Sequence, residues 1–225
     1  MNKESAYRTF VILFVVIFQT SDAQSYDSLK ASIQDTRYRI CEEYEVADST
    51  GKDSLLHYSQ KYLFTVITEQ LLPCWYGTEW NFNGITKVPK QGSIACGIFV
   101  TTVLSDAGFN LSRIACGQLA SETLIKKLTP EIKRYYKADM KKVIDYLNDK
   151  PDGLYIVGLD THIGFIKKSG KTLEFIHSNY YYQNEKVMAQ SLTCLNPLTD
   201  SSYRIIGKIL QDDMMKKWIL NERYE

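Results

Sequence analysis

Three side chains in the sequence could together perform nucleophilic chemistry: Cys96, His162 and His177. A thiol attacks acyl carbon only as the thiolate, and a positioned imidazole can take its proton. Cys96 follows the small residues GSIA and opens the apolar stretch GIFVTTVLSDAG, so we expect it at the start of a helix. There the helix dipole favours the thiolate, and a backbone N–H could face a developing oxyanion. These features predict acyl transfer with Cys96 as the nucleophile.

The two histidines stand in neighbouring strand-like runs, HIGFIK and TLEFIH, on either side of Ser169-Gly170. If that pair forms a two-residue hairpin loop, His162 and His177 face each other directly, and one imidazole can orient the other. Asn179 lies on the same face as His177 and is the alternative orienting group. The pattern predicts His162 as the general base, with His177 or Asn179 as the third member.

Two other interpretations of these residues stay open. A cysteine is often buried as a small hydrophobic residue without a chemical role. Two histidines and a cysteine could also bind zinc, but the sequence has no CxxC or HxxxH spacing and no carboxylate placed with them. We therefore expect neither a metal nor another cofactor. The third histidine, His57, falls in an amphipathic helical pattern, where a structural role is the default.

The N-terminus has the pattern of a secretory signal. Lys3 and Arg8 precede an apolar run from Phe10 to Phe18, and small residues lead up to Ala23. The run is about half of the ~20 residues that span a bilayer, so we expect cleavage near Ala23 and no stable membrane insertion. Residues 1–23 would be the signal peptide, and the mature protein would be periplasmic or extracellular.

Composition limits the remaining possibilities. The chain has 225 residues, 44% of them hydrophobic, which is enough for one domain over residues 24–225 with a helical extension at about 24–72. The formal net charge of +1 makes nucleic acid an unexpected partner. Five cysteines leave at least one thiol unpaired, and a catalytic role for that thiol is one explanation. The pairing of the other four stays open: Cys41, Cys74, Cys116 and Cys194.

The elements that would position these residues form a helical first half and a strand-rich second half. Helical spacing predicts helices over about 28–45 and 54–72, the second ended by Pro73, then over 121–128 and about 131–149, with a last helix at 213–223. The segment 75–92 is rich in Gly, Pro and aromatic residues and predicts a long loop. The remaining short runs predict an antiparallel sheet: LYIVGL, HIGFIK, TLEFIH, KVMAQSL and YRIIGKIL.

The segments QGSIACGIFVTT and HIGFIKKSGKTLEFIHS together resemble the NlpC-like cell-wall cysteine peptidases of the papain fold. In that family a Cys opens a helix, a His begins a strand, and a third polar residue, often His, follows across a hairpin. Cys96 matches the nucleophile, His162 the base and His177 the third member. Where the family has Asp-Cys-Ser-Gly, this chain has the segment 95–98, Ala-Cys-Gly-Ile.

The resemblance implies an α+β, papain-like fold in which N-terminal helices, including the Cys-bearing one, pack on a C-terminal antiparallel sheet. Tyr76 and Trp80 resemble the aromatic loop before the family's Cys, and Gln91 resembles an oxyanion glutamine. The implied activity is cleavage of an amide bond in a peptidoglycan stem peptide or another peptide substrate. Two alternatives remain: a transglutaminase-like acyltransferase, whose third residue is usually Asp, and an inactive binding protein on the same fold.

Overall fold

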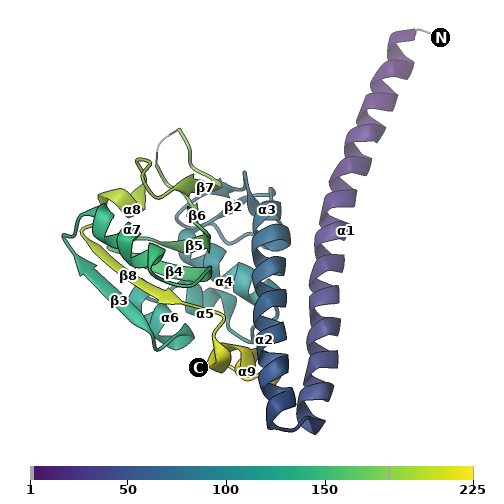
Figure 1. Ribbon diagram of the computed structural model, residues 1–225. Coiled ribbons are helices and arrows are strands. Elements are labelled where there is room, and N and C mark those ends of the chain that lie inside the picture. Colours follow the sequence, from purple (N-terminus) through teal and green to yellow (C-terminus); the bar gives the residue numbers. More distant parts are fainter. Residues whose placement is uncertain (1–2, 182, 225) are drawn as a thin grey trace.

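Two long helices begin the chain and run antiparallel to each other (Figure 1). The structure is a computed structural model that describes the backbone of residues 3–181 and 183–224, and the side chains of residues 25–181 and 183–224. Helix α1 spans Lys3–Val46 and α2 spans Ser49–Val66. The side chain of Asp48 caps α2 by accepting a hydrogen bond from the backbone N–H of Gly51. The helix expected over 28–45 is confirmed within α1, and residues 54–66 of the helix expected over 54–72 are confirmed within α2.

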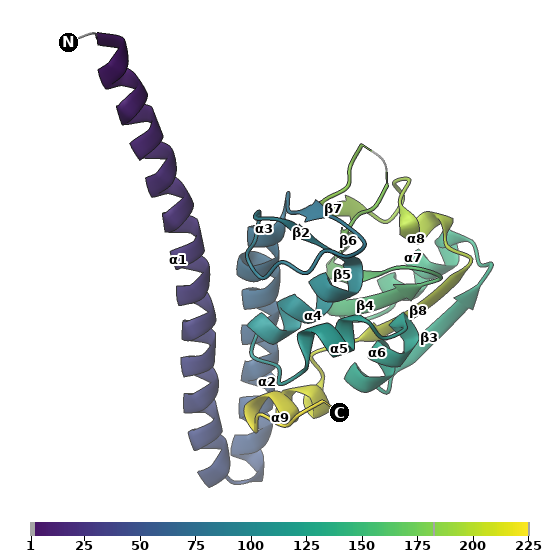
Figure 2. The ribbon, with the colours of Figure 1, turned by 180° about the vertical axis from the view of Figure 1, so that it is seen from behind.

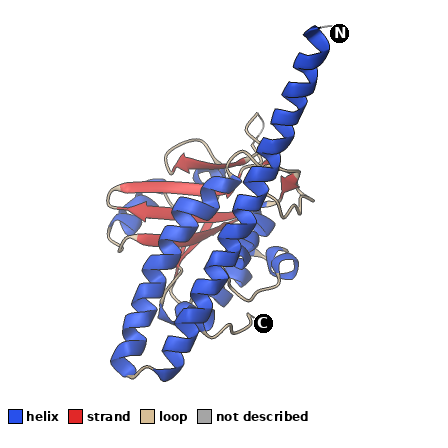
Figure 3. Ribbon diagram, turned by 90° about the vertical axis from the view of Figure 1, so that its right-hand side faces the viewer, coloured by secondary structure: helices blue, strands red, loops and turns tan. Residues whose placement is uncertain are grey.

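The predicted signal peptide, residues 1–23, lies outside the residues whose side chains are described. From Lys3 its backbone forms the first part of α1, which projects beyond the rest of the molecule (Figure 3). Cleavage near Ala23 and export stay predictions. Among the helical residues with described side chains, no stretch combines the length and the apolar character that crossing a membrane requires.

The second helix does not end at Pro73, as the sequence predicted. It continues through a π-helical turn, η1 (Ile67–Leu71), into α3 (Leu72–Trp75), which contains the proline. A proline lacks the backbone N–H and its ring crowds the carbonyl one turn earlier. The wider π turn just before the proline accommodates the ring, because its backbone hydrogen bonds span five residues and not four.

Six strands form one antiparallel sheet in the order β3-β8-β4-β5-β6-β7. The antiparallel sheet expected in the second half of the chain is therefore confirmed, with one strand more than the sequence indicated. The strands are β3 (Ile132–Tyr136), β4 (Gly153–Leu159), β5 (Ile163–Ser169), β6 (Thr172–Ser178), β7 (Val187–Ser191) and β8 (Tyr203–Lys208). A separate parallel pair joins β1 (Glu79–Trp80), within the segment 75–92 that was expected to be a loop, to β2 (Ser93–Ile94), directly after that segment.

Helices cover both faces of the sheet. One face carries α4 (Cys96–Asp106), α5 (Arg113–Gly117) and α6 (Ser121–Leu128), seen in front of the strands in Figure 2. The other face carries α7 (Met140–Asn148) and α8 (Pro197–Asp200), seen in Figure 1. Successive strand residues alternate between the two cores, so Phe165 packs on the α4 side and Ile166 on the α7 side. The last helix, α9 (Asp212–Ile219), packs against α1 and α2.

The helix expected over about 131–149 is wrong in its first part. Residues 132–136 form β3, which pairs with β8 along the edge of the sheet, and the helix begins only at Met140. Both structures fit the run IKRYY, which is rich in β-favouring residues. Pairing with β8 decides between them, because a strand there satisfies backbone groups that β8 would otherwise expose at an edge.

The hairpin between β5 and β6 is present, but its loop is one residue further along than expected. Ser169 pairs with Thr172, so the loop is Gly170-Lys171 and not Ser169-Gly170. Gly170 has a φ of 57°, a conformation that glycine adopts without strain. The predicted pairing therefore shifts by two residues, and a shift of two keeps every side chain on the face expected for it.

Candidate functional site

Cys96 is the first residue of α4, as the sequence predicted. Ala95 precedes it in an extended conformation and supplies no side-chain cap. The helix is held against the sheet by buried aromatic residues, including an edge-on contact between Phe99 and Phe165 with ring centroids 6.2 Å apart. The thiol is therefore attached to a rigid element at a fixed place beside the sheet.

Close backbone packing explains the glycine that follows Cys96. A Cβ atom on Gly97 would collide with the carbonyl oxygen of Gly117 in α5. A Cβ atom on Gly117 would lie 2.7 Å from Cδ1 of Ile98 and 2.8 Å from Oγ1 of Thr101. The start of α4 and the end of α5 thus approach each other at two glycines, and a serine at position 97 would not fit.

His162 and His177 contact each other directly. Nε2 of His162 lies 2.8 Å from Nδ1 of His177, and the two rings are nearly perpendicular, at 88°. Because of the shifted register they are diagonal neighbours across β5 and β6 and not opposite ones. The side chain of Asn179 is engaged elsewhere: it donates to the carbonyl of Asn184 and accepts from the backbone N–H of Tyr181. Of the two residues proposed to orient the base, His177 is the one in contact with it.

Glycine at position 164 makes room for this diagonal contact. A Cβ atom there would lie 2.9 Å from Cβ of His177, 2.8 Å from the carbonyl oxygen of Ile176 and 2.7 Å from Cε2 of Phe175. The ring of Phe175 in turn stacks on His177, with centroids 4.0 Å apart. The bare backbone of Gly164 on one side and the aromatic ring on the other therefore define where the His177 imidazole lies.

The histidine pair has one free atom and one further partner. Nδ1 of His162 is buried and has no hydrogen-bond partner among the described residues. At the other end, Nε2 of His177 lies 2.9 Å from Oε1 of Gln190 on β7. Both nitrogens of His177 have partners, whereas Nδ1 of His162 is buried without one in the described part of the chain.

Burial controls the protonation of all three groups. Burial lowers the pKa of His162 well below its usual value, and the neighbouring His177 lowers it further. Burial also lowers the pKa of His177 to about 4, although the contact with Gln190 acts in the opposite direction. Both imidazoles are therefore neutral at pH 7.

The pKa of the Cys96 thiol is raised, which corrects the expectation from the helix dipole. Burial is the largest effect, and backbone hydrogen bonding from Ile163 and Gly97 opposes it without overcoming it. The dipole at a helix start contributes only a fraction of a charge, and desolvation outweighs it here. The contact with Ile163 also places the thiol beside the residue that follows His162. The resting site thus holds a neutral thiol and a neutral imidazole.

Cys96 and His162 line one pocket of about 440 Å³ at the end of the sheet where β4 ends and β5 begins. No hydrogen bond joins the two side chains in the described structure. In enzymes without bound substrate, catalytic hydrogen bonds are often long and shorten when substrate binds. The other residues around the pocket include small, apolar and polar ones: Gly97, Gly117, Leu119, Ala120, Ser121, Glu122, Leu124, Leu159, Asp160, Thr161, Ile163 and Tyr203.

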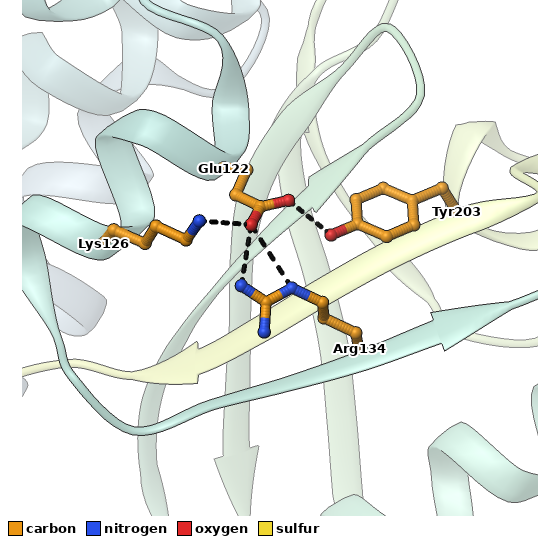
Figure 4. A network of polar contacts seen from close by, with 4 residues as sticks. All are labelled: Glu122, Lys126, Arg134 and Tyr203. Atoms are coloured by element: carbon orange, nitrogen blue, oxygen red, sulfur yellow. Dashed lines mark hydrogen bonds and ion pairs between the residues drawn. The ribbon is translucent and has the colours of Figure 1, made fainter.

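An exposed network of four residues includes two that line this pocket, Glu122 and Tyr203 (Figure 4). Glu122 on α6 accepts from Arg134 on β3 at 2.7 Å, from Lys126 at 2.6 Å and from the hydroxyl of Tyr203 on β8. Hydrogen bonding to Lys126, then to Tyr203 and Arg134, lowers the pKa of Glu122 to about 2. The network links α6 to two strands, so it fixes the helix that carries Ser121 and Glu122 at the pocket.

The aromatic residues predicted for the site divide into two groups. Trp80 contacts the ring of Tyr180 at 5.8 Å between centroids, and Tyr180 contacts His162 at 5.2 Å. Trp80 is thus connected to the base through one intervening ring. Tyr76 does not line the pocket; burial raises its pKa to about 12, with smaller effects from Glu174 and Glu69.

Gln91 does not line the pocket that contains Cys96. Its side chain is exposed, and its backbone N–H donates to the carbonyl of Val88 in a turn. Gln91 and Tyr76 are therefore not brought together with the thiol, whereas Cys96, His162, His177 and, indirectly, Trp80 are. The catalytic roles of all these residues stay predictions.

The cysteines and possible metal ligands add little to the site. All five cysteines are among the described residues, and no disulfide joins any of them. Cys194 is exposed and Cys116 is buried, while the other three are partly buried. Within the described part of the chain, no group of three or more His, Cys, Asp or Glu side chains lies close enough together to hold a metal ion.

Sequence reasoning missed Gln190, Gly164 and Tyr180. The two strand residues follow from alternation once the register is known, because each lies on the same face as His177. Their detection required the exact β5–β6 and β6–β7 pairing, which no pattern in the sequence fixes. Tyr180 stands in a tyrosine-rich stretch of the sequence, and only its position next to His162 in the structure distinguishes it.

The geometry of the site is the evidence on function that this chain offers, because comparisons with protein-family models, curated proteins and solved structures yield no match.

Proposed function

We propose that this protein is a cysteine hydrolase that cleaves an amide bond through a thioester on Cys96, with His162 as the general base. The observation that carries the proposal is the state of His162: His177 contacts its Nε2 at 2.8 Å, and its Nδ1 is buried and unpartnered. His162 lines the same pocket as Cys96. A base held through one nitrogen, with its other nitrogen free of a hydrogen bond, can activate a thiol that it reaches. Phe175, which stacks on His177, belongs to the core on the α7 side of the sheet, whereas Cys96 packs on the α4 side, so the reaction requires the His162 imidazole to turn towards the thiol at the shared pocket.

The arrangement of elements supports a papain-like fold as part of this proposal. A cysteine opens a helix that packs on an antiparallel sheet, a histidine precedes one strand, and its partner lies near the end of the next strand. This is the order of elements in the NlpC-like enzymes that the sequence resembles. Gly97, which departs from the family motif, is explained by packing against Gly117 and does not remove any group that the chemistry uses.

The reaction proceeds in two halves. Nδ1 of His162 takes the proton from Sγ of Cys96 as the sulfur attacks the amide carbonyl, and a backbone N–H at the start of α4 faces the oxyanion. The imidazolium then protonates the leaving nitrogen, the C–N bond breaks and a thioester remains. Water attacks the thioester with His162 again as base, which releases the acid and restores the thiol.

Because the pKa of the thiol is raised and the pKa of the imidazole is lowered, proton transfer accompanies attack and no ion pair forms in advance. The proposed substrate is a peptidoglycan stem peptide, supported by the family resemblance and by the expected export. A transglutaminase-like reaction is less well supported, since the group in contact with His162 is His177 and not a carboxylate.

The test is digestion of purified peptidoglycan and of synthetic stem peptides, followed by mass spectrometry of the products. We expect cleavage by the wild type and none by Cys96→Ser, with His162→Ala reduced by about 10²-fold to 10⁴-fold, the usual contribution of a general base. Cys194→Ser is the matched control, because Cys194 is exposed and outside the pocket.

Cleavage that continues in Cys96→Ser would refute the nucleophile. Cleavage of simple peptides but not of stem peptides would retain the chemistry and refute the substrate class. No cleavage or acylation with either substrate, in a folded protein, would favour the inactive binding protein.

A further inference from the structure

Gln190 stands at the far end of a line of three hydrogen-bonded side chains that runs from the residue before β5 through β6 to β7. His162 precedes β5, His177 is on β6 and Gln190 is on β7, and the successive contacts are 2.8 Å and 2.9 Å. Gln190 pairs with Phe175 in the β6–β7 ladder, so it reaches His177 diagonally, as His177 reaches His162. Gln190 is half-buried, whereas His177 is fully buried.

The amide oxygen determines which way the hydrogen bonds run along this line. A neutral imidazole has one N–H donor and one acceptor nitrogen, and an amide oxygen only accepts. Nε2–H of His177 therefore donates to Oε1 of Gln190, and Nδ1 of His177 must be the acceptor. It follows that Nε2–H of His162 donates to His177, which leaves the lone pair of His162 on Nδ1.

We propose that Gln190 is a positioning residue that, through His177, fixes His162 in the tautomer with an unprotonated Nδ1. This inference rests on the proposed function, in which Nδ1 takes the thiol proton. If the hydrogen bonds ran in the opposite direction, from His177 to His162, the hydrogen of His162 would be on Nδ1. His162 would then be unable to act as a base. Gln190 contacts neither the thiol nor the pocket, so it acts only through His177.

Three substitutions separate this role from simple packing. Gln190→Glu keeps an acceptor and should retain kcat/KM within about 3-fold at pH 7. Gln190→Met offers neither donor nor acceptor, so the hydrogen bond between His177 and His162 can run in either direction. Both tautomers of His162 become populated, and kcat/KM should fall by about 10-fold. Gln190→Lys offers only a donor, so the line should reverse and kcat/KM should fall by about 10²-fold, within the range for loss of a general base.

Gln190→Glu carries a second signature. A carboxylate beside His177 favours the imidazolium, which donates from both nitrogens and so places a hydrogen on Nδ1 of His162. The acid limb of the pH–rate profile should therefore move to higher pH than in the wild type. Loss of packing alone would lower the rate without moving this limb.

The direct readout is the protonated nitrogen of His162, identified from long-range ¹H–¹⁵N correlations of the imidazole in the full-length protein. We expect Nε2–H in the wild type and in Gln190→Glu at neutral pH, a mixture in Gln190→Met, and Nδ1–H in Gln190→Lys. Gln60→Met is the matched control, because it removes a glutamine that bonds Asp212 and not the histidines.

An unchanged His162 tautomer in both Gln190→Met and Gln190→Lys would overturn the inference. If the lysine variant does not fold, the tautomer of His162 in Gln190→Met alone decides the test. The spectra do not depend on turnover, so absence of hydrolysis would refute the proposed function while the tautomer result still decides the role of Gln190.

Discussion

Gly164 and His177 lie so close across the β5–β6 hairpin that a Cβ atom on Gly164 would stand 2.9 Å from Cβ of His177. The absence of a side chain at position 164 is therefore a condition for the contact between the two histidines. The glycine in HIGFIK, which by sequence alone weakens a strand, has a specific purpose at the site.

Gly164→Ala should displace His177 and separate it from His162. We expect a loss of about 1–3 kcal/mol in the free energy of unfolding, because the new methyl group overpacks a buried site. The hydrolytic rate should also fall at temperatures where the variant is still fully folded, so that unfolding does not account for the loss of activity. Urea denaturation and kcat/KM measure the two effects.

The matched control for this variant is Gly51→Ala in α2, which adds the same methyl group outside the site. It should leave kcat/KM unchanged. Equal activity of Gly164→Ala and wild type would show that the His162–His177 contact tolerates displacement, contrary to the account.

The stability of the protein should fall in mild acid. The native state keeps His177 neutral with a pKa of about 4, whereas an unfolded histidine takes up a proton near pH 6.5. The stabilisation is therefore complete above about pH 6.5 and is lost as the pH falls towards 4. The linkage amounts to roughly 3 kcal/mol for His177.

The free energy of unfolding, measured at intervals from pH 7.5 to 4, tests this expectation. His177→Gln should show a flatter profile, while His57→Gln, at an exposed histidine, should keep the steep one. Identical profiles for the wild type and His177→Gln would mean that His177 is not neutral in the native state.

Alkylation of Cys96 should be slow at neutral pH in the absence of substrate. The pKa of the thiol is raised by burial, so its reactive thiolate forms only at alkaline pH. We expect the iodoacetamide rate at Cys96, followed by peptide mapping, to rise steadily beyond pH 9 without a plateau between pH 5 and 8. Such a plateau would reveal a preformed thiolate–imidazolium pair and contradict the neutral resting state.

Gly97→Ser restores one residue of the family motif and should nevertheless destabilise the protein. The new side chain would collide with the carbonyl of Gly117, at an estimated cost of about 3 kcal/mol in the free energy of unfolding. Thermal and urea denaturation measure the effect. Ala115→Ser, at an exposed position of α5, is the control and should be close to neutral. Wild-type stability of Gly97→Ser would show that α5 moves easily away from α4.

The elements with strong periodicity could be predicted from the sequence. The start of α4 at Cys96 and all five strand-like runs followed from local pattern, and the shared face of the two histidines survived because the register error was two residues. The β3 strand could not be predicted in the same way, because its state depends on pairing with the edge of β8. Local preference does not report such long-range pairing.

The types of residue in the candidate site could be predicted from the sequence, but the burial of their side chains could not. The spacing of Cys96 and the histidines suggested the chemistry, but burial reverses the pKa shift that the helix position implies for the thiol. Tyr76 was assigned by resemblance to the family's aromatic loop and Gln91 by resemblance to an oxyanion glutamine, and neither residue lines the pocket. Side-chain direction within irregular loops is set by tertiary contacts, which spacing does not encode.

The central claim, that Cys96 forms a thioester with help from His162, is tested most directly by intact-protein mass spectrometry after rapid mixing with an activated acyl ester. The account predicts one acyl group per wild-type molecule, located at Cys96 by peptide mapping and lost again on hydrolysis. It predicts no acylation of Cys96→Ala and acylation at least 10²-fold slower in His162→Ala. Equal rates of acylation in wild type and His162→Ala, or acylation at another cysteine, would contradict it.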